Sequence, residues 1–354
     1  MYDVFLSFVC AFLSCYFILP SIIHVARLKH LCDEPGSRHS HTEKTPSLGG
    51  IGIFAGVMFS MIFWIPSNVF SVLQYNLCAF IVIFLAGVKD DIVPLSALKK
   101  LFWQIIAAGI VVVKANIKIT SLHGFLGINE IPEWFSIGIS IFTIIVIINA
   151  FNLIDGINGL SGCLAVIISL TYGTWFYLAD KIVLAIMAYS LAGAVLAFLR
   201  YNFTPARIFM GDTGALLIGL MLSIFTIQFI EINGQLINIH PFAIRTGPAF
   251  AIAVLILPLF DTLRVFVIRI LRGSSPFKPD RLHIHHLLLN IGFTHMQATA
   301  FLSVISILFI LLALLLQNIG TFQLIALIVA IAWTLSFILQ HVVEQRRLHL
   351  TDIR

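Results

Sequence analysis

The stretch AFLSVISILFILLALLL, residues 300–316, contains no charged side chain. A helix needs about 17–25 mostly apolar residues to cross the hydrocarbon core of a membrane. Comparable runs occupy residues 5–26, 51–66 and 248–268. Only 10% of the 354 residues are charged, against about 25% in a soluble domain, and the mean hydropathy is +1.04. The sequence therefore predicts an all-α integral membrane protein.

The apolar runs predict a single membrane-embedded domain, residues 1–354, built as a polytopic bundle of about eleven transmembrane helices. The first run has no basic segment before it and no cleavage site of small residues after it, so it is expected to remain as a helix rather than to be removed as a signal peptide. The expected helices are 4–26, 48–65, 71–88, 100–115, 135–152, 160–178, 183–200, 212–230, 248–268, 297–317 and 321–341. The loop 116–133 is long enough for a short hairpin.

Basic residues predict the orientation, because Lys and Arg gather in cytoplasmic loops. With the N-terminus outside and the C-terminus in the cytoplasm, only Lys114, Lys118, Lys181 and Arg245 face outward, and the other 17 of the 21 face inward. This distribution explains the net charge of +5 without a nucleic-acid partner. The five cysteines form no C-x-x-C pair and indicate neither a disulfide framework nor a zinc site.

All polar clusters fall at the predicted cytoplasmic ends of the helices, which indicates one site on one face. They are DEPGSRHSHTEKTPSLGG (33–50), GVKDDIVP (87–94), NAFNLIDGINGL (149–160), RYNFTPARIFMGDTGALLIG (200–219), PLFDTLR (258–264) and PDRLHIHHLL (279–288). Each alone has an ordinary explanation: an acidic cap, an Asn/Gly turn, or an interfacial histidine patch. Asp261, for example, could simply pair with Arg264.

The residue types in these clusters favour phosphoryl transfer. Asp90, Asp91, Asp155 and Asp212 offer the hard oxygen ligands that Mg²⁺ prefers, and Asn152 offers a carbonyl oxygen. Nearby Lys, Arg and His supply donors for phosphate oxygens. The start of the helix at 212 is also expected to suit an anion. Together, carboxylates, a hard metal and cations are typical of phosphoryl transfer.

A cation- or proton-coupled transporter is the alternative of another class, because acids within a membrane often mark ion paths. A transporter is expected to place its acids near the bilayer midplane, on broken helices in matched halves. Here the acids lie near one interface, and the two halves are not alike. The enzyme interpretation is therefore favoured.

The ordered motifs TPSLGG (45–50), KDD (89–91), NAFNLIDGINGL (149–160), FMGDTG (209–214) and PDRLHIHH (279–286) resemble those of the polyprenyl-phosphate N-acetylhexosamine-1-phosphate transferase family. The similarity runs from about residue 27 to 296. The His-x-His-His pattern at 283–286 looks like the branch that transfers GlcNAc-1-phosphate from UDP-GlcNAc to undecaprenyl phosphate. The alternative is the phospho-N-acetylmuramoyl-pentapeptide transferase branch of peptidoglycan synthesis, which tends to have three consecutive histidines there.

The resemblance implies roles for individual residues. Asn152 and Asp212 match Mg²⁺ ligands, with Mn²⁺ as a substitute, and Asp90 and Asp91 match an essential acidic pair. His285 and His286 would face the diphosphate and share in catalysis. The residues that it places at the substrates are Lys44, Thr45, Asp155, Asn202, Phe209, Arg281 and His283.

The expected reaction takes place at the cytoplasmic face of a bacterial inner membrane. It joins a UDP-N-acetylhexosamine to undecaprenyl phosphate and releases UMP, as the first membrane step of a cell-surface polysaccharide. The lipid phosphate is largely ionised at neutral pH, with a second pKa of roughly 6, so a general base would contribute modestly. The residues leave open direct attack or an aspartyl-phosphate intermediate, and a monomer or a homodimer. On a helix His283 would point to a different face from His285, and its loss is expected to be milder.

Overall fold

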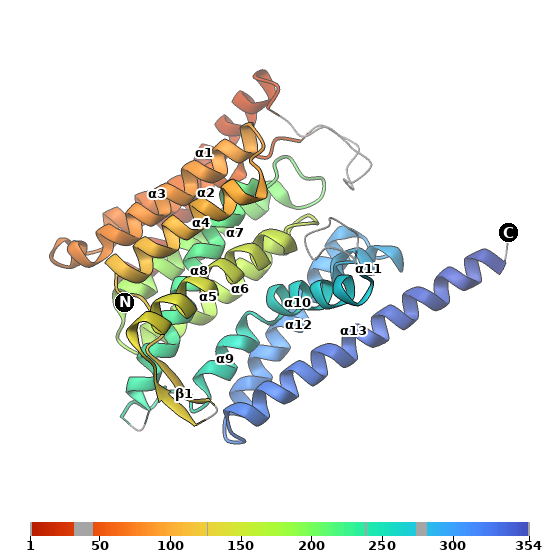
Figure 1. Ribbon diagram of the computed structural model, residues 1–354. Helices are drawn as coiled ribbons and strands as arrows, with labels where there is room; N and C mark the ends of the chain where they lie inside the picture. The colour runs from red at the N-terminus through yellow and green to blue at the C-terminus, as the bar shows by residue number, and fades with distance from the viewer. Residues whose placement is uncertain (1, 32–44, 126, 238, 274–281, 353–354) are drawn as a thin grey trace.

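The computed structural model describes residues 2–352, except 32–44, 126, 238 and 274–281. It is helical almost throughout (Figure 1). The first half contains α1 (Tyr2–Leu28), α2 (Gly49–Trp64), η1 (Ser67–Val69), α3 (Phe70–Ile92), α4 (Ala97–Gly109), η2 (Ile110–Lys114), β1 (Ser121–Phe125), β2 (Ile128–Glu130) and α5 (Glu133–Ile154). The second half contains α6 (Leu160–Leu178), α7 (Ile182–Asn202), α8 (Gly211–Leu236), α9 (Gly247–Val254), α10 (Ile256–Leu271), α11 (Ile284–Asn290), α12 (His295–Leu315) and α13 (Thr321–Asp352).

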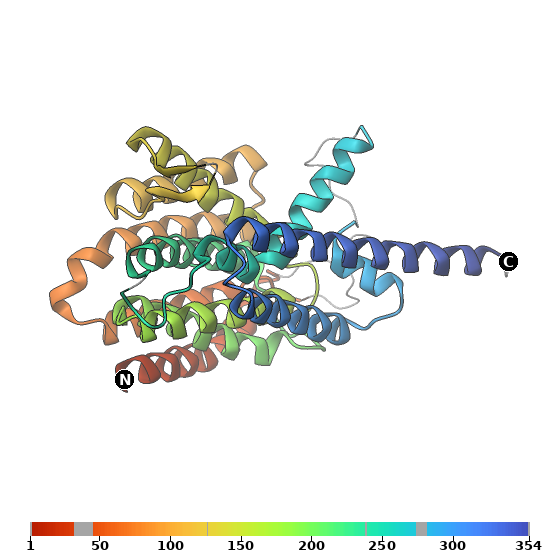
Figure 2. The ribbon, with the colours of Figure 1, turned by 90° about the horizontal axis from the view of Figure 1, so that it is seen from below.

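Helix α8 forms the centre of the bundle. Every residue from Thr213 to Ile227 is buried, as expected for a helix that is apolar on all sides. Helices α2, α3, α5, α6 and α9 pack around it, and α1 packs on α2 and α7. Helix α13 packs on α9, α11 and α12 and projects well beyond the bundle (Figures 1 and 2).

Each of the eleven predicted helices has a counterpart, which confirms the all-α membrane fold. Seven helices in the described part of the chain are long and apolar enough to span a membrane, or eight if α9 and α10 form one span. The count of eleven spans therefore stays a prediction. Helices such as α2, with 16 residues, are apolar but fall short of this length criterion.

The predicted continuous helix 248–268 is wrong. The structure has two helices there, α9 and α10, which meet at Leu255 with a bend of 77°. Pro258 explains the break, because its ring replaces the N–H that would donate to the carbonyl of Val254 and clashes with that carbonyl. Helix α9 ends at Val254. The bend directs α10 toward α5 and α12.

The hairpin predicted between residues 116 and 133 is confirmed by the antiparallel pair β1 and β2. The chain just before it is fixed to α8. The N–H and the hydroxyl of Thr120 donate to the two carboxylate oxygens of Glu231, at 2.9 and 2.5 Å. The hairpin is therefore attached to the end of α8 opposite Asp212, so it marks the other side of the bundle from the acidic motifs.

The orientation can be tested with single cysteines in a variant that lacks the five native ones. We expect Glu344→Cys on α13 to react with a membrane-impermeant maleimide only after the membrane is opened, because the basic residues place this end in the cytoplasm. Glu130→Cys on the hairpin is the matched control and should react in intact cells. Both side chains are exposed. The reverse pattern would overturn the predicted orientation.

Candidate active site

Two carboxylates from different helices share one ammonium group. The Nζ atom of Lys100, at the start of α4, lies 2.6 Å from Asp90 Oδ2 and 2.6 Å from Asp212 Oδ2. The backbone N–H of Leu95 donates to the other oxygen of Asp90 at 2.6 Å. The side chain of Asn152, near the end of α5, lies beside that of Asp212. Four helices therefore bring charged or amide groups to one point.

Asp91 has a different task from its neighbour Asp90. Its Oδ1 accepts the N–H of Asp212 at 2.7 Å, and its Oδ2 accepts the N–H and the hydroxyl of Thr213 at 3.0 and 2.5 Å. The start of α8 holds an anion, as expected, and that anion is a carboxylate of the protein itself, Asp91, which accepts those two N–H groups. Asp91 fixes the position of Asp212 and so acts on the site indirectly.

The TPSLGG motif of residues 45–50, which we call the first-loop motif, pairs with the segment that precedes α8. Phe209 N–H donates to the carbonyl of Pro46 at 2.7 Å, Gly49 N–H to Phe209 at 2.9 Å, and Gly50 N–H to Met210 at 2.9 Å. Phe209, one of the residues that the family resemblance places at the substrates, is partly exposed beside this pairing. This pairing of residues 46–50 with Phe209 and Met210, which we call the splint, fixes the position of the start of α8.

Two glycines have no room for a side chain: Gly50 in the splint and Gly211, directly after it. A Cβ on Gly50 would lie 2.1 Å from the backbone N of Gly214. A Cβ on Gly211 would lie 2.0 Å from the carbonyl oxygen of Ser47, and Gly211 also has φ of +70°, a region that favours glycine. The two backbones are therefore in direct contact.

The loop after α5 carries the fourth carboxylate. Ser161 Oγ donates to Asp155 Oδ1 at 2.5 Å. Burial raises the pKa of Asp155 to about 6. The hydrogen bond from Ser161 lowers this pKa, and the negative charge of Asp212 raises it. Asp155 is therefore close enough to Asp212 to sense its charge.

The amide of Asn202, a predicted substrate contact, forms hydrogen bonds within the protein. Its Oδ1 accepts Gly159 N–H at 2.7 Å, and its Nδ2 donates to the Ile208 carbonyl at 3.0 Å. The side chain is 6% exposed. The structure therefore gives Asn202 the task of joining the loop after α5 to the loop before α8.

His285 lies against the same loop. A Cβ on Gly156 would be 2.2 Å from His285 Nε2, so the ring rests on the backbone next to Asp155. The side chain is 2% exposed, and both ring nitrogens lack a hydrogen-bond partner among the described residues. Burial, followed by the charge of His286, lowers the pKa of His285 to about 3. His285 is thus a neutral imidazole with unused hydrogen-bonding capacity.

The expectation that His283 points away from His285 is wrong. His283 precedes α11 and has extended backbone angles (φ −60°, ψ 148°), so helical spacing does not apply to it. The two rings stack at 5.7 Å with an angle of 11° between them. The rings of His285 and His286 lie 4.3 Å apart.

The structure brings most of the predicted site residues together. Lys44 and Arg281 lie outside the described residues. Thr45 is buried beside the splint. Sequence reasoning missed Lys100, which it counted only as a marker of orientation. The short connection of residues 93–96 was the available signal, because it turns α4 back beside the end of α3.

Comparisons with known proteins identify the family of this chain. The sequence model of glycosyl transferase family 4 matches residues 72–230. The chain is 30% identical to a probable undecaprenyl-phosphate N-acetylglucosaminyl 1-phosphate transferase of Bacillus subtilis, over 90% of this chain and 86% of that protein. It is 31% identical to the undecaprenyl-phosphate α-N-acetylglucosaminyl 1-phosphate transferase of Escherichia coli K12, over 77% of this chain and 73% of that protein. For the enzyme of the same name from Yersinia pestis the figures are 31%, 76% and 72%.

The splint predicts a measurable loss of stability. We expect Gly50→Ala to destabilise the detergent-solubilised protein by at least about 1–3 kcal/mol, because its methyl group would overlap rigid backbone. Gly138→Ala on α5 is the matched control, since no atom lies within 4 Å of its added Cβ; it should be neutral or slightly stabilising. Thermal unfolding of both variants compares them. Equal unfolding midpoints would refute the close contact.

Proposed function

Because the chain belongs to glycosyl transferase family 4, we propose that it transfers GlcNAc-1-phosphate from UDP-GlcNAc to undecaprenyl phosphate. The products are undecaprenyl-diphospho-GlcNAc and UMP. The observation that carries the proposal is the meeting of Asp90, Asp212 and Lys100 beside the loop on which His285 rests. Acidic and donor groups at one point are what the transfer of a phosphoryl group between two anions requires.

In the proposed reaction, an oxygen of the lipid phosphate attacks the sugar-side phosphorus of UDP-GlcNAc. A new P–O bond forms to the lipid phosphate, and the bond between that phosphorus and the oxygen of UMP breaks. UMP leaves with the electron pair. No proton transfer is needed at neutral pH, because the attacking phosphate is already largely ionised, with a second pKa of about 6.

The donor set fits Mg²⁺. Asp90, Asp212 and Asn152 bring carboxylate and amide groups together, and Mg²⁺ prefers such oxygens together with substrate phosphates. The two carboxylates already hold one cation, the ammonium of Lys100. We assign Asp212 and Asn152 as the ligands from the protein. Bound there, Mg²⁺ would neutralise charge on the diphosphate.

Asp90 is better placed to orient groups than to form a covalent bond. Each of its carboxylate oxygens accepts a hydrogen bond, one from Leu95 and one from Lys100. The proposal therefore takes direct attack by the lipid phosphate in place of an aspartyl-phosphate intermediate. Lys100 remains 30% exposed, so its ammonium can also reach a substrate phosphate as a point charge.

His285 supplies a donor for the diphosphate. As a neutral imidazole it has one N–H to donate, and neither ring nitrogen is used within the described protein. A buried polar group without a partner is costly, and a bound substrate oxygen would relieve that cost. Asp155 and Phe209 border the same region and are proposed to contact the nucleotide.

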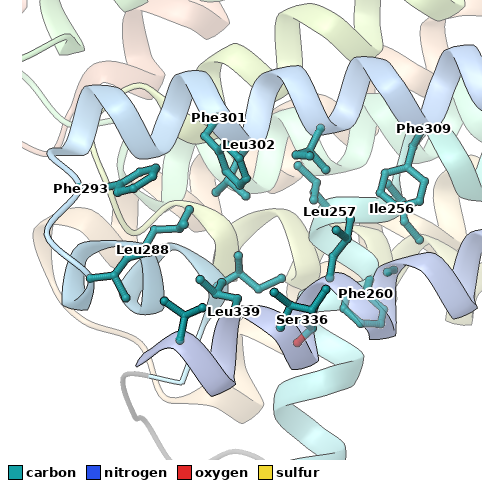
Figure 3. A pocket seen from close by; sticks show the side chains of 17 residues that line it. Ile256, Leu257, Phe260, Leu288, Phe293, Phe301, Leu302, Phe309, Ser336 and Leu339 are labelled. Atoms are coloured by element: carbon teal, nitrogen blue, oxygen red, sulfur yellow. The ribbon is translucent and has the colours of Figure 1, made fainter. Parts of the chain in front are cut away.

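An apolar cavity of about 230 Å³ lies next to the histidine segment (Figure 3). Helices α10, α11, α12 and α13 contribute its side chains, and among those that Figure 3 labels only Ser336 carries a polar group. Leu288 projects into it from α11, the helix that directly follows His283. We propose that the polyprenyl chain of the lipid substrate lies in this cavity, with its phosphate toward the histidines.

The proposed activity has a direct test. Purified protein, undecaprenyl phosphate and Mg²⁺ are incubated with UDP-GlcNAc, UDP-GalNAc or UDP-N-acetylmuramoyl-pentapeptide, and the lipid product is identified by mass spectrometry. We expect undecaprenyl-diphospho-GlcNAc and UMP in equal amounts. A product from the pentapeptide substrate alone would place the chain in the peptidoglycan branch.

The metal assignment predicts the behaviour of Asp212→Asn. We expect turnover to be abolished and the dependence on Mg²⁺ to weaken, because a formal charge is removed from a site that holds a dication. The unfolding midpoint should change little, since Asn retains the size of the side chain. Near-normal activity at millimolar Mg²⁺ would show that Asp212 is not a ligand.

The role of His285 is tested by its replacement with Ala. Loss of one donor to developing charge lowers kcat by about 10²–10³-fold in other enzymes, and we expect a loss in that range. If instead KM for UDP-GlcNAc rises while kcat is unchanged, His285 only binds substrate. Unchanged kinetics would leave the histidines as an interfacial patch.

A further inference from the structure

Two charged residues of α10 hold three consecutive residues of the histidine segment. Asp261 Oδ2 lies 2.8 Å from His283 Nδ1, and Asp261 Oδ1 accepts the N–H of Ile284 at 2.9 Å. Arg264 Nη2 donates to the carbonyl of Leu282 and also to Asp261 Oδ1, the latter at 3.3 Å. A carbonyl, a ring and an N–H of adjacent residues are thus fixed by one acid and one base, which we call the α10 clamp.

The α10 clamp is buried. Asp261 is 2% exposed and Arg264 is 0% exposed. Replacing a buried ion pair with well-packed apolar side chains is often neutral or stabilising. Stability alone therefore gives little reason to keep these charges in so apolar a chain, whereas an orienting task does.

The α10 clamp is connected to His285 through the ring of His283. His283 is stacked in parallel on His285. Asp261, His285 and Ile154, the last residue of α5, lie around one gap that has no room for a water molecule. A carboxylate at Nδ1 keeps a proton on that nitrogen and fixes the plane of the ring. A fixed His283 ring in turn limits the positions open to the His285 ring.

On the basis of the proposed function, we propose that Asp261 is a positioning residue for phosphoryl transfer. With Arg264, it sets the orientation of His283 and the start of α11, and so places His285 over Gly156. Asp261 acts through the histidines and does not touch the substrate itself.

The kinetic test compares Asp261→Asn with Thr262→Ala. Asn keeps the size of Asp261 but removes its charge and one of its acceptors. Thr262 is the matched control, because its hydroxyl donates to the carbonyl of Pro258 within α10. For Asp261→Asn we expect kcat to fall by about 10- to 100-fold, the range found when the partner that orients a ligand histidine is lost. KM for UDP-GlcNAc should stay close to its original value, and Thr262→Ala should match the unchanged protein.

A double mutant separates positioning from general packing. If Asp261 acts through His283, then Asp261→Asn should lower kcat far less in a His283→Ala background than in the unchanged protein. Equal losses in both backgrounds would overturn the proposal. So would a rise in KM without a fall in kcat.

Hydrogen exchange gives a readout that does not need the assay. In the full-length protein in detergent, Asp261→Asn should speed the exchange of backbone amides at residues 284–290, because one neutral amide oxygen remains where two carboxylate oxygens faced His283 and the Ile284 N–H, while Thr262→Ala should not. Unchanged exchange in Asp261→Asn would overturn the proposal. If the unchanged protein transfers no GlcNAc-1-phosphate, only the proposed function fails, and exchange still decides whether Asp261 positions this segment.

Discussion

The ammonium of Lys100 between the carboxylates of Asp90 and Asp212 is the contact on which the site depends. Two carboxylates this close repel each other unless a cation lies between them. The end of α3 and the starts of α4 and α8 must therefore lie at the same level of the bundle. Asp91 holds α8 at that level through the backbone of Asp212 and Thr213. Of the adjacent acids, Asp90 forms part of the site, and Asp91 fixes the position of α8.

Local pattern was enough to predict most of the helices. Long apolar runs have few alternatives in a membrane, because every backbone group must be bonded within its own segment. The prediction of one continuous helix over residues 248–268 was wrong for a local reason. Pro258 lies within apolar sequence, and its effect falls on the carbonyl four residues earlier. A proline in such a run predicts a break as well as a span.

The site was predicted less completely, because its contacts join distant segments. The motifs indicated the acidic residues and the histidines, but the tasks of Asp91 and Asn202 depend on partners more than 40 residues away. Arg264 was foreseen as a partner of Asp261 because it lies three residues along the same helix. His283, 22 residues away, could not be. Lys100 was missed because a lysine at a helix end also marks orientation.

The splint between the first-loop motif and the segment before α8 joins parts of the chain that are made at different times. About 160 residues separate its two sides, which at about 5–20 residues per second is a delay on the order of 10 to 30 s during synthesis. Until Phe209 and Met210 emerge, the N–H groups of Gly49 and Gly50 have none of the partners described above. The acidic pair at the end of α3 likewise waits for the start of α8. The candidate site is thus assembled late in biogenesis, after α8 has been synthesised.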